Sequence, residues 1–167
     1  MATIKWVDNL PSFREIAELP LLDAAIHEAL RLHPAAPSSL PRETPAGGRT
    51  LNGVFISAKT VVSMQCYTTQ RDPRVFPNPD SFLPERWLEP DDMSSEAKTL
   101  FMPFSSGPRV CLGKNLAMME LKLITSVLVR RFNIQVAPDT TEDSMRLTDH
   151  FLTMPKAGKY ELVFTRV

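Results

Sequence analysis

The chain has 167 residues, a length typical of one domain, and 43% of them are hydrophobic, which is enough to form a buried core. Nineteen basic residues balance nineteen acidic ones, so the net charge of +0 lacks the positive excess that would favour nucleic acid or an anionic membrane. Two cysteines, Cys66 and Cys111, are too few for a disulfide framework and indicate a reducing compartment. Without a long apolar run or a signal-peptide core, the sequence predicts a soluble, cytosolic chain.

Two helices are predicted near the start of the chain. The Pro11-Ser12 pair favours the opening of a short helix, and Pro20 suits the first turn of a second helix, where its missing N–H would have no intrahelical partner. Pro34 ends the second helix. Its apolar face has the spacing of one helix side and consists of Leu22, Ala25, Ile26, Ala29 and Leu30.

The middle of the chain is rich in proline, because nine of its fifteen prolines lie between Pro34 and Pro90. Residues 50–64 are rich in β-branched and aromatic types, and the Asn52-Gly53 pair predicts a two-residue type I′ hairpin within a small antiparallel sheet. Residues 71–90 contain five prolines, which predicts a coil packed by its own side chains.

A long helix is predicted over residues 114–132, where apolar residues on most sides indicate a buried, central helix. Strands are expected at residues 132–136, 151–154 and 160–164. The pattern as a whole predicts a mainly α fold with small β-sheets, in the α+β class.

The most specific motif is Phe104-Ser-Ser-Gly107-Pro-Arg109-Val-Cys111-Leu-Gly113, a loop that delivers a cysteine to the start of the long helix. The N–H groups and partial positive charge of a helix start stabilise a thiolate. Gly107 permits a tight turn, Gly113 lets a flat partner approach the backbone, and Arg109 offers a charged hydrogen bond to a carboxylate. A thiolate in these surroundings suits haem iron.

An isolated cysteine is most often a buried structural thiol, and Cys66, in a predicted strand, fits that interpretation. For Cys111 the whole ten-residue pattern favours a ligand. The histidines and cysteines form no short ligand pairs, which disfavours zinc.

Three charged residues have two possible interpretations. Glu28 and Arg31 are three residues apart on the second helix and lie off its apolar face, so spacing alone favours a solvated pair worth about 0.2 to 0.5 kcal/mol. If Arg86, in Pro84-Glu-Arg-Trp, reached them, the three would form a network that locks the coil to the helix.

In their order along the chain, Glu28-x-x-Arg31, Pro84-Glu-Arg86-Trp and the cysteine loop resemble the haem-thiolate monooxygenases, the cytochromes P450. Residues 11–167 resemble the C-terminal, haem-binding portion of the fungal microsomal type, whereas residues 1–10 do not follow the family pattern. The resemblance implies a haem cofactor held by Cys111. The other residues that it implies for haem binding are Arg109, Arg42, Phe104, Gly107 and Gly113. It further implies that Glu28, Arg31 and Arg86 form a buried structural network.

The resemblance also implies an activity, which is O₂-dependent hydroxylation or oxidation of a small apolar metabolite, as in secondary-metabolite biosynthesis. Electrons would come from an NADPH-dependent reductase docking near Arg109, Lys114 and Lys122. Substrate-facing residues would be 36–40 and 150–152. Full-length relatives are anchored to the endoplasmic reticulum membrane.

The sequence departs from the family pattern in ways that matter for activity, and the missing upstream segments favour a rival interpretation. The oxygen-activating helix and the membrane anchor lie upstream of Glu-x-x-Arg in the family, and this chain begins after them, so no residue in it is expected to be catalytic. Gln70 stands where a histidine often precedes Arg71-Asp-Pro. The rivals are therefore a truncated, inactive fragment and a haem-binding module without oxygen chemistry.

Overall fold

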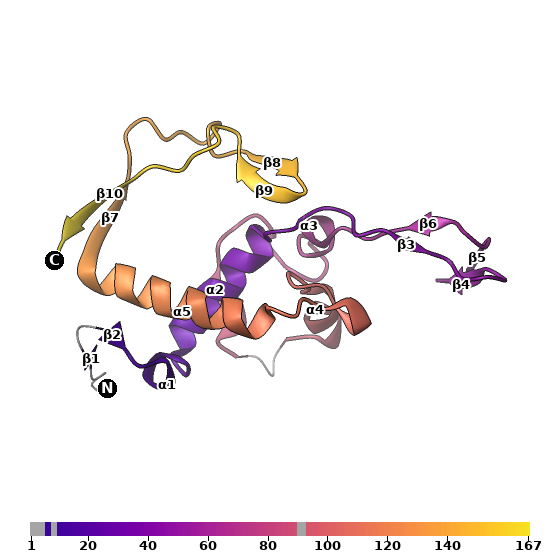
Figure 1. The fold of residues 1–167 in the computed structure, drawn as a ribbon, viewed down its shortest axis with the longest axis horizontal. Coiled ribbons are helices and arrows are strands. Elements are labelled where there is room, and N and C mark those ends of the chain that lie inside the picture. Colours follow the sequence, from indigo (N-terminus) through magenta and orange to yellow (C-terminus); the bar gives the residue numbers. More distant parts are fainter. Residues whose placement is uncertain (1–5, 8–9, 90–92) are drawn as a thin grey trace.

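The computed structural model describes residues 6–7, 10–89 and 93–167. Two helices, α2 and α5, pack across each other, a long arm of strands extends to one side, and the strand pairs β7–β10 and β8–β9 lie above the helices in the view of Figure 1. The helical elements are α1 (Phe13–Ile16), α2 (Pro20–Leu32), α3 (Cys66–Thr69), α4 (Ser95–Leu100), α5 (Lys114–Arg131) and the 3-10 turns η1 (Pro84–Trp87) and η2 (Gly107–Arg109). The strands are β1 (Trp6–Val7), β2 (Leu10–Pro11), β3 (Arg42–Glu43), β4 (Arg49–Leu51), β5 (Val54–Ile56), β6 (Val61–Val62), β7 (Phe132–Val136), β8 (Leu147–His150), β9 (Leu152–Pro155) and β10 (Leu162–Arg166). This arrangement is the predicted mixture of helices and small sheets.

Both predicted N-terminal helices are present. Ser12 precedes α1, and its backbone N–H and hydroxyl both donate to the carboxylate of Glu15, which fixes the start of the helix. Pro20 is the first residue of α2, which ends before Pro34 as predicted. The last carbonyls of α2 accept hydrogen bonds from the side chains of Gln70 and Arg71, which follow α3, so that the orphan carbonyls of this helix end are satisfied.

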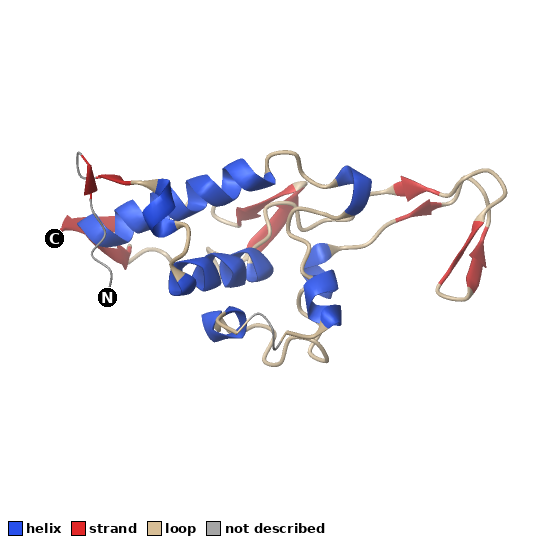
Figure 2. Ribbon diagram, turned by 90° about the horizontal axis from the view of Figure 1, so that it is seen from below, coloured by secondary structure: helices blue, strands red, loops and turns tan. Residues whose placement is uncertain are grey.

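The arm contains the predicted hairpin. Asn52 (φ 47°) and Gly53 (φ 80°) both have the left-handed conformation that a type I′ turn needs, and they join β4 to β5. At the base of the arm β3 pairs with β6 (Figure 2). The prediction of a strand at Cys66 is wrong, because Cys66 begins α3, where its buried thiol donates to the carbonyl of Ala36 at 3.2 Å.

The coil from residue 71 to residue 89 packs on α2 through η1. Phe76, 2% exposed, lies 5.4 Å from the guanidinium of Arg31, measured to the ring centroid. The buried hydrophobic core of this part of the chain comes from α1, α2, α3, α4 and the coil, and consists of Ile16, Ala24, Ile26, Leu32, Cys66, Phe76 and Ala97.

The long helix α5 forms as predicted but the prediction that it is buried is wrong. None of its described residues is buried, and Leu116, Ile124 and Val129 are each more than half exposed. Among the described elements, α1, α2, β2 and β7 make the main contacts with α5, and apolar side chains on its other sides are exposed. The apolar surface of α5 is therefore covered only in part by the described residues of this chain.

The C-terminal strands form two antiparallel pairs. β7 matches the predicted strand at both ends and pairs with β10 along its whole length, from Phe132 opposite Arg166 to Val136 opposite Leu162. β9 pairs with β8, which the sequence patterns did not predict. Thr153 in β9 donates to the carbonyls of Pro34 and Ala35, and this ties the β8–β9 hairpin to the end of α2.

Candidate functional site: a cysteine loop held by a buried ionic network

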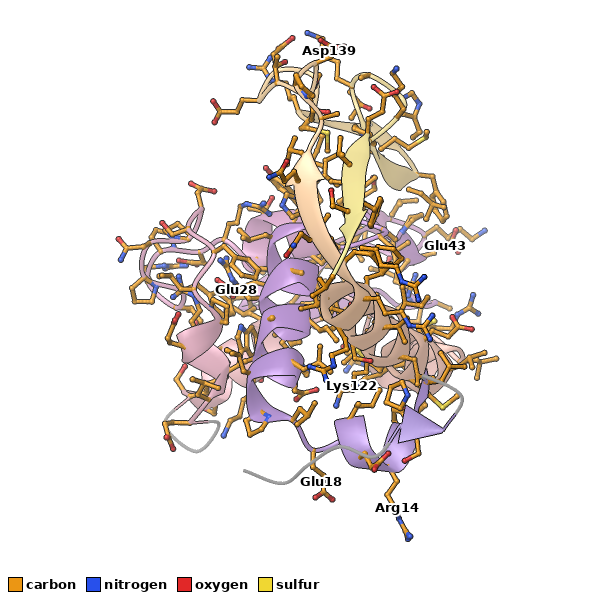
Figure 3. All side chains as sticks on the ribbon, turned by 90° about the vertical axis from the view of Figure 1, so that its left-hand side faces the viewer. Arg14, Glu18, Glu28, Glu43, Lys122 and Asp139 are labelled. Atoms are coloured by element: carbon orange, nitrogen blue, oxygen red, sulfur yellow. The ribbon has the colours of Figure 1, made fainter. Side chains whose placement is uncertain are left out.

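Glu28 is completely buried and accepts five hydrogen bonds. Arg31, also 0% exposed, donates to both carboxylate oxygens at 2.8 Å, from Nε and Nη2. Arg86 Nε donates at 3.0 Å, the backbone N–H of Leu83 at 3.0 Å, and Trp87 Nε1 at 2.9 Å. Three of these five bonds come from the coil, so the carboxylate joins α2 to the coil (Figure 3).

The charges of this network fit together electrostatically. Burial by itself would raise the pKa of Glu28, but the hydrogen bonds, led by that of Arg31, outweigh burial and lower the pKa from 4.5 to about 2. Arg31 also donates to the carbonyls of Gln70, Pro79 and Ser81. Glu28 is thus ionised, and the guanidinium of Arg31 is held by its carboxylate and by three backbone carbonyls.

Trp87 extends the network into an aromatic cluster. Its ring centroid lies 4.5 Å from that of Phe101 and 5.3 Å from that of His27. Phe101 follows α4 and immediately precedes the segment that leads into the cysteine loop. Through Trp87 and Phe101, the aromatic cluster therefore connects the Glu28 network to the segment that leads into the cysteine loop.

The cysteine loop is a series of tight turns. Gly107 has a φ of 69° at the start of η2, which is the left-handed conformation that glycine adopts without strain. The N–H of Cys111 donates to the carbonyl of Phe104 at 2.9 Å and closes the loop. Gly113 is the residue before α5, so Cys111 lies just ahead of an 18-residue helix.

Cys111 and Arg109 are exposed, and both line a mainly apolar cavity of about 330 Å³. Phe104 lines the same cavity from the start of the loop. The opposite wall is formed by segments far from the loop in sequence, namely Ala36, Ser38 and Leu40 after α2, Met64 and Cys66 at α3, and Phe151 at the tip of the β8–β9 hairpin. The structure therefore brings the cysteine loop to the two segments that the sequence suggested as substrate-facing.

Other predicted site residues lie elsewhere. Arg42 is outside the cavity lining, and its Nη1 donates to the carbonyls of Leu40 and Pro41. His150 and Leu152 flank Phe151 but do not line the cavity. The prediction that Lys122 belongs to a docking surface is wrong, because its side chain is only 12% exposed. It donates to the carbonyl of Ala17 and pairs with Asp23 at 2.6 Å between α2 and α5 (Figure 3).

Three contributors to the site had no clear sequence signal. Gln70, 0% exposed, connects α2 to the segment before the cysteine loop, and the sequence marked it only as a departure from a pattern. Trp87 lies in the Pro84-Glu-Arg-Trp motif, which hinted at its place but not at its bond to Glu28. Asp149 accepts from the hydroxyl of Ser38 and so joins the β8–β9 hairpin to the segment after α2.

Comparison with known proteins agrees with this geometry. The family model described as Cytochrome P450 matches residues 4–162, so the chain belongs to the cytochrome P450 family. It is 43% identical over 145 residues to "Cytochrome P450 monooxygenase aflV" of Aspergillus parasiticus, covering 86% of this chain and 28% of that protein. It is 38% identical over 149 residues to "Cytochrome P450 monooxygenase stcB" of Emericella nidulans, covering 88% of this chain and 29% of that protein.

Solved structures show the same fold. A retinoic acid-bound cyanobacterial CYP120A1 matches with a TM-score of 0.80 at 27% identity, over 92% of this chain and 35% of its own. A zebra fish cytochrome P450 with abiraterone matches with a TM-score of 0.79 at 28% identity, over 95% of this chain and 35% of its own. The chain thus spans less than a third of the curated relatives' length and about a third of these structures. No helix among the described residues is long and apolar enough to cross a membrane.

The cavity fits the haem that the family implies. It combines one exposed thiol, one arginine and an otherwise largely apolar lining, which are the features that a flat apolar ring with an iron centre and carboxylate side groups would contact. Nothing in the described lining supplies a competing histidine ligand.

Proposed function

We propose that this chain forms the cysteine-bearing wall of a haem-thiolate monooxygenase that oxidises a small apolar metabolite, as in secondary-metabolite biosynthesis. The observation that supports this most is the cavity in which Cys111 and Arg109 face the segment of Ala36 to Leu40 and the hairpin tip at Phe151. An exposed thiol and an apolar wall from distant segments line the same cavity there.

In this proposal, four parts of the chain have different roles. The Cys111 thiolate would hold the haem iron, and haem when bound would supply the activation of O₂. Arg109 would pair with a haem carboxylate, and Phe104 would pack beside the thiolate and exclude water from it. The apolar residues Ala36, Leu40 and Phe151 would hold an apolar substrate. The Glu28 network would keep the walls in place.

The surface beside the cysteine loop, around Arg109 and Lys114, would bind an NADPH-dependent reductase that supplies electrons. Arg109 and Lys114 are both exposed at this surface and suit an acidic partner, whereas Lys122 is engaged inside the chain. Between Glu96 and Glu120 the sequence has no acidic residue, so the loop carries a local positive charge although the whole chain is neutral.

The test of the proposal is the spectrum of the chain reconstituted with haem. We expect the ferrous-CO complexes of the wild type and of Cys66→Ser to show the Soret band of a thiolate ligand, and Cys111→Ser to lack it. Cys66→Ser is the matched control, because it removes the other thiol by the same substitution. A thiolate-type band that survives in Cys111→Ser would contradict the proposal.

A second candidate is a haem-binding chain that does not oxidise substrate. The exposed apolar sides of α5 and the open cavity favour it, since controlled oxidation needs a site closed to bulk water. With haem, reductase and NADPH, this candidate predicts that hydrogen peroxide release by the 167-residue chain greatly exceeds product formation. Tightly coupled substrate hydroxylation would exclude it.

A further inference from the structure

Gln70 is a fully buried amide that connects two segments of the chain through all of its side-chain polar atoms. It is 0% exposed. Its Nε2 donates to the carbonyls of Leu30 and Arg31 at the end of α2, at 3.2 and 3.0 Å. Its Oε1 accepts from the backbone N–H of Met102 at 2.9 Å. The side chain therefore bridges the C-terminus of α2 and the entrance to the cysteine loop.

The backbone carbonyl of Gln70 also connects this residue to the ionic network. Arg31 Nη1 donates to the Gln70 carbonyl at 2.9 Å, while Gln70 Nε2 donates to the Arg31 carbonyl. The two residues hold each other reciprocally, and Arg31 is itself bound to Glu28. The network that holds Arg31 in place therefore also holds Gln70 in place.

From Met102 a short chain of hydrogen bonds leads to the cysteine. The carbonyl of Met102 accepts from the N–H of Ser105 at 2.9 Å, and the carbonyl of Phe104 accepts from the N–H of Cys111 at 2.9 Å. The N–H of Met102 is the place where this loop is bonded to Gln70.

We propose that Gln70 is a positioning residue that fixes the cysteine loop relative to α2 and so holds Cys111 at the edge of the cavity. The effect on haem ligation rests on the proposed function, but the effect on the loop does not. A neutral amide suits this place because it has donors on one side for two carbonyls and an acceptor on the other for one N–H. A buried residue without those groups would leave Met102 N–H or the α2 carbonyls without a partner.

The experiment compares three variants of the 167-residue chain. Gln70→Met keeps the length of the side chain and removes both its donors and its acceptor. Gln70→Glu keeps an acceptor for Met102 N–H but loses the amide donors toward α2. Thr44→Val is the matched control, because it removes buried hydrogen bonds with Ser57 and Thr60 at the base of the arm and leaves the loop untouched.

The first measurement is native-state hydrogen exchange of the amides of Met102, Ser105 and Cys111, compared with global stability from denaturant unfolding. In Gln70→Met we expect these amides to exchange roughly tenfold faster than the change in global stability explains, as for loss of one partner of a buried hydrogen bond. In Gln70→Glu, which loses the donors that anchor the side chain to α2, we expect a smaller excess in the same direction, and in Thr44→Val we expect loop exchange to follow global stability. If Gln70→Met does not fold, the Gln70→Glu result decides: loop exchange that follows global stability there contradicts the proposal.

The second measurement is the ferrous-CO spectrum after haem reconstitution. Gln70→Met should shift a substantial share of the haem from the thiolate-type band to the band of a neutral thiol, whereas Thr44→Val at equal stability should not. Loop exchange and spectrum that both follow global stability in every variant would overturn the proposal. If Cys111→Ser keeps the thiolate band, the proposed function fails, but the exchange result still tests the role of Gln70.

Discussion

The coil side of α2 and the cysteine side of α5 differ in how far the chain completes them. On the coil side Glu28, Arg31 and Gln70 are 0% exposed, and each has its hydrogen-bond partners within this chain. On the other side Cys111 and Arg109 are exposed, Leu112 is fully exposed, and no described residue of α5 is buried.

This difference shows where the fold is self-sufficient. Buried charges are costly unless they are paired and hydrogen-bonded, so the network must be complete wherever α2 and the coil fold. An apolar helix side and an open apolar cavity carry no such requirement, but their burial would be favourable. The network is therefore complete within this chain, whereas the cysteine side keeps apolar surface whose burial would be favourable.

The largest expected effect is the loss of Glu28. Its removal leaves Arg31 buried without a counter-charge, which typically costs about 3 to 5 kcal/mol of unfolding free energy. We expect Glu28→Ala to lower the denaturation midpoint accordingly, or to prevent folding. The exposed Glu96→Ala is the control and should cost less than about 1 kcal/mol. Equal effects of the two substitutions would mean that the network does not stabilise the chain.

A related effect is expected on acidification. Because the pKa of Glu28 is lowered from 4.5 to about 2, its stabilising contribution is complete above about pH 4.5 and is lost as the pH falls toward 2. At about 1.4 kcal/mol for each pKa unit, the loss is on the order of 3 kcal/mol. Denaturant unfolding between pH 6 and pH 2 measures it. In Glu28→Gln the same pH range should show a shallower loss, and an unchanged slope would contradict the assignment.

A smaller effect is expected at Trp87. The change Trp87→Phe removes one of the five hydrogen bonds to Glu28 and keeps the aromatic contact with Phe101, so we expect a cost of about 1 to 2 kcal/mol. A double-mutant cycle with Glu28→Gln checks the cause. If the cost of Trp87→Phe is the same in both backgrounds, the bond to the carboxylate is not what Trp87 contributes.

The smallest effect is expected on α5. Ile124 is 58% exposed, so Ile124→Ser should change the unfolding free energy of this chain by no more than about 0.5 kcal/mol. The buried Ile26→Ala on α2 is the matched contrast and should cost about 2 to 5 kcal/mol. A large loss in Ile124→Ser would show that α5 is covered in solution, for example in a dimer, and sedimentation would detect the dimer.

The sequence predicts the local elements well where the signal is local. Pro20, the Asn52-Gly53 pair and the start of α5 after Gly113 each determine a helix start or a turn through their own backbone preferences. It fails where the outcome depends on distant partners. The burial of Glu28 depends on a coil more than fifty residues away, and helical spacing alone favoured a solvated pair.

The same limit applies to the site. The cysteine loop is specific enough to mark Cys111, but spacing carries no information on which segments form the opposite wall of the cavity or on what becomes of Lys122 and Arg42. The exposure of α5 could not be predicted because an apolar pattern reports which sides favour burial, and not what covers them.

Native-state hydrogen exchange across the whole chain tests the contrast between the two sides most directly. Amides of α2, such as those of Arg31 and Leu32, should exchange only through global unfolding, because the buried network joins them to the coil. Amides of the middle of α5, such as that of Ile124, should exchange through local openings of lower free energy. Equal protection of α2 and α5 up to the global unfolding free energy would contradict the account.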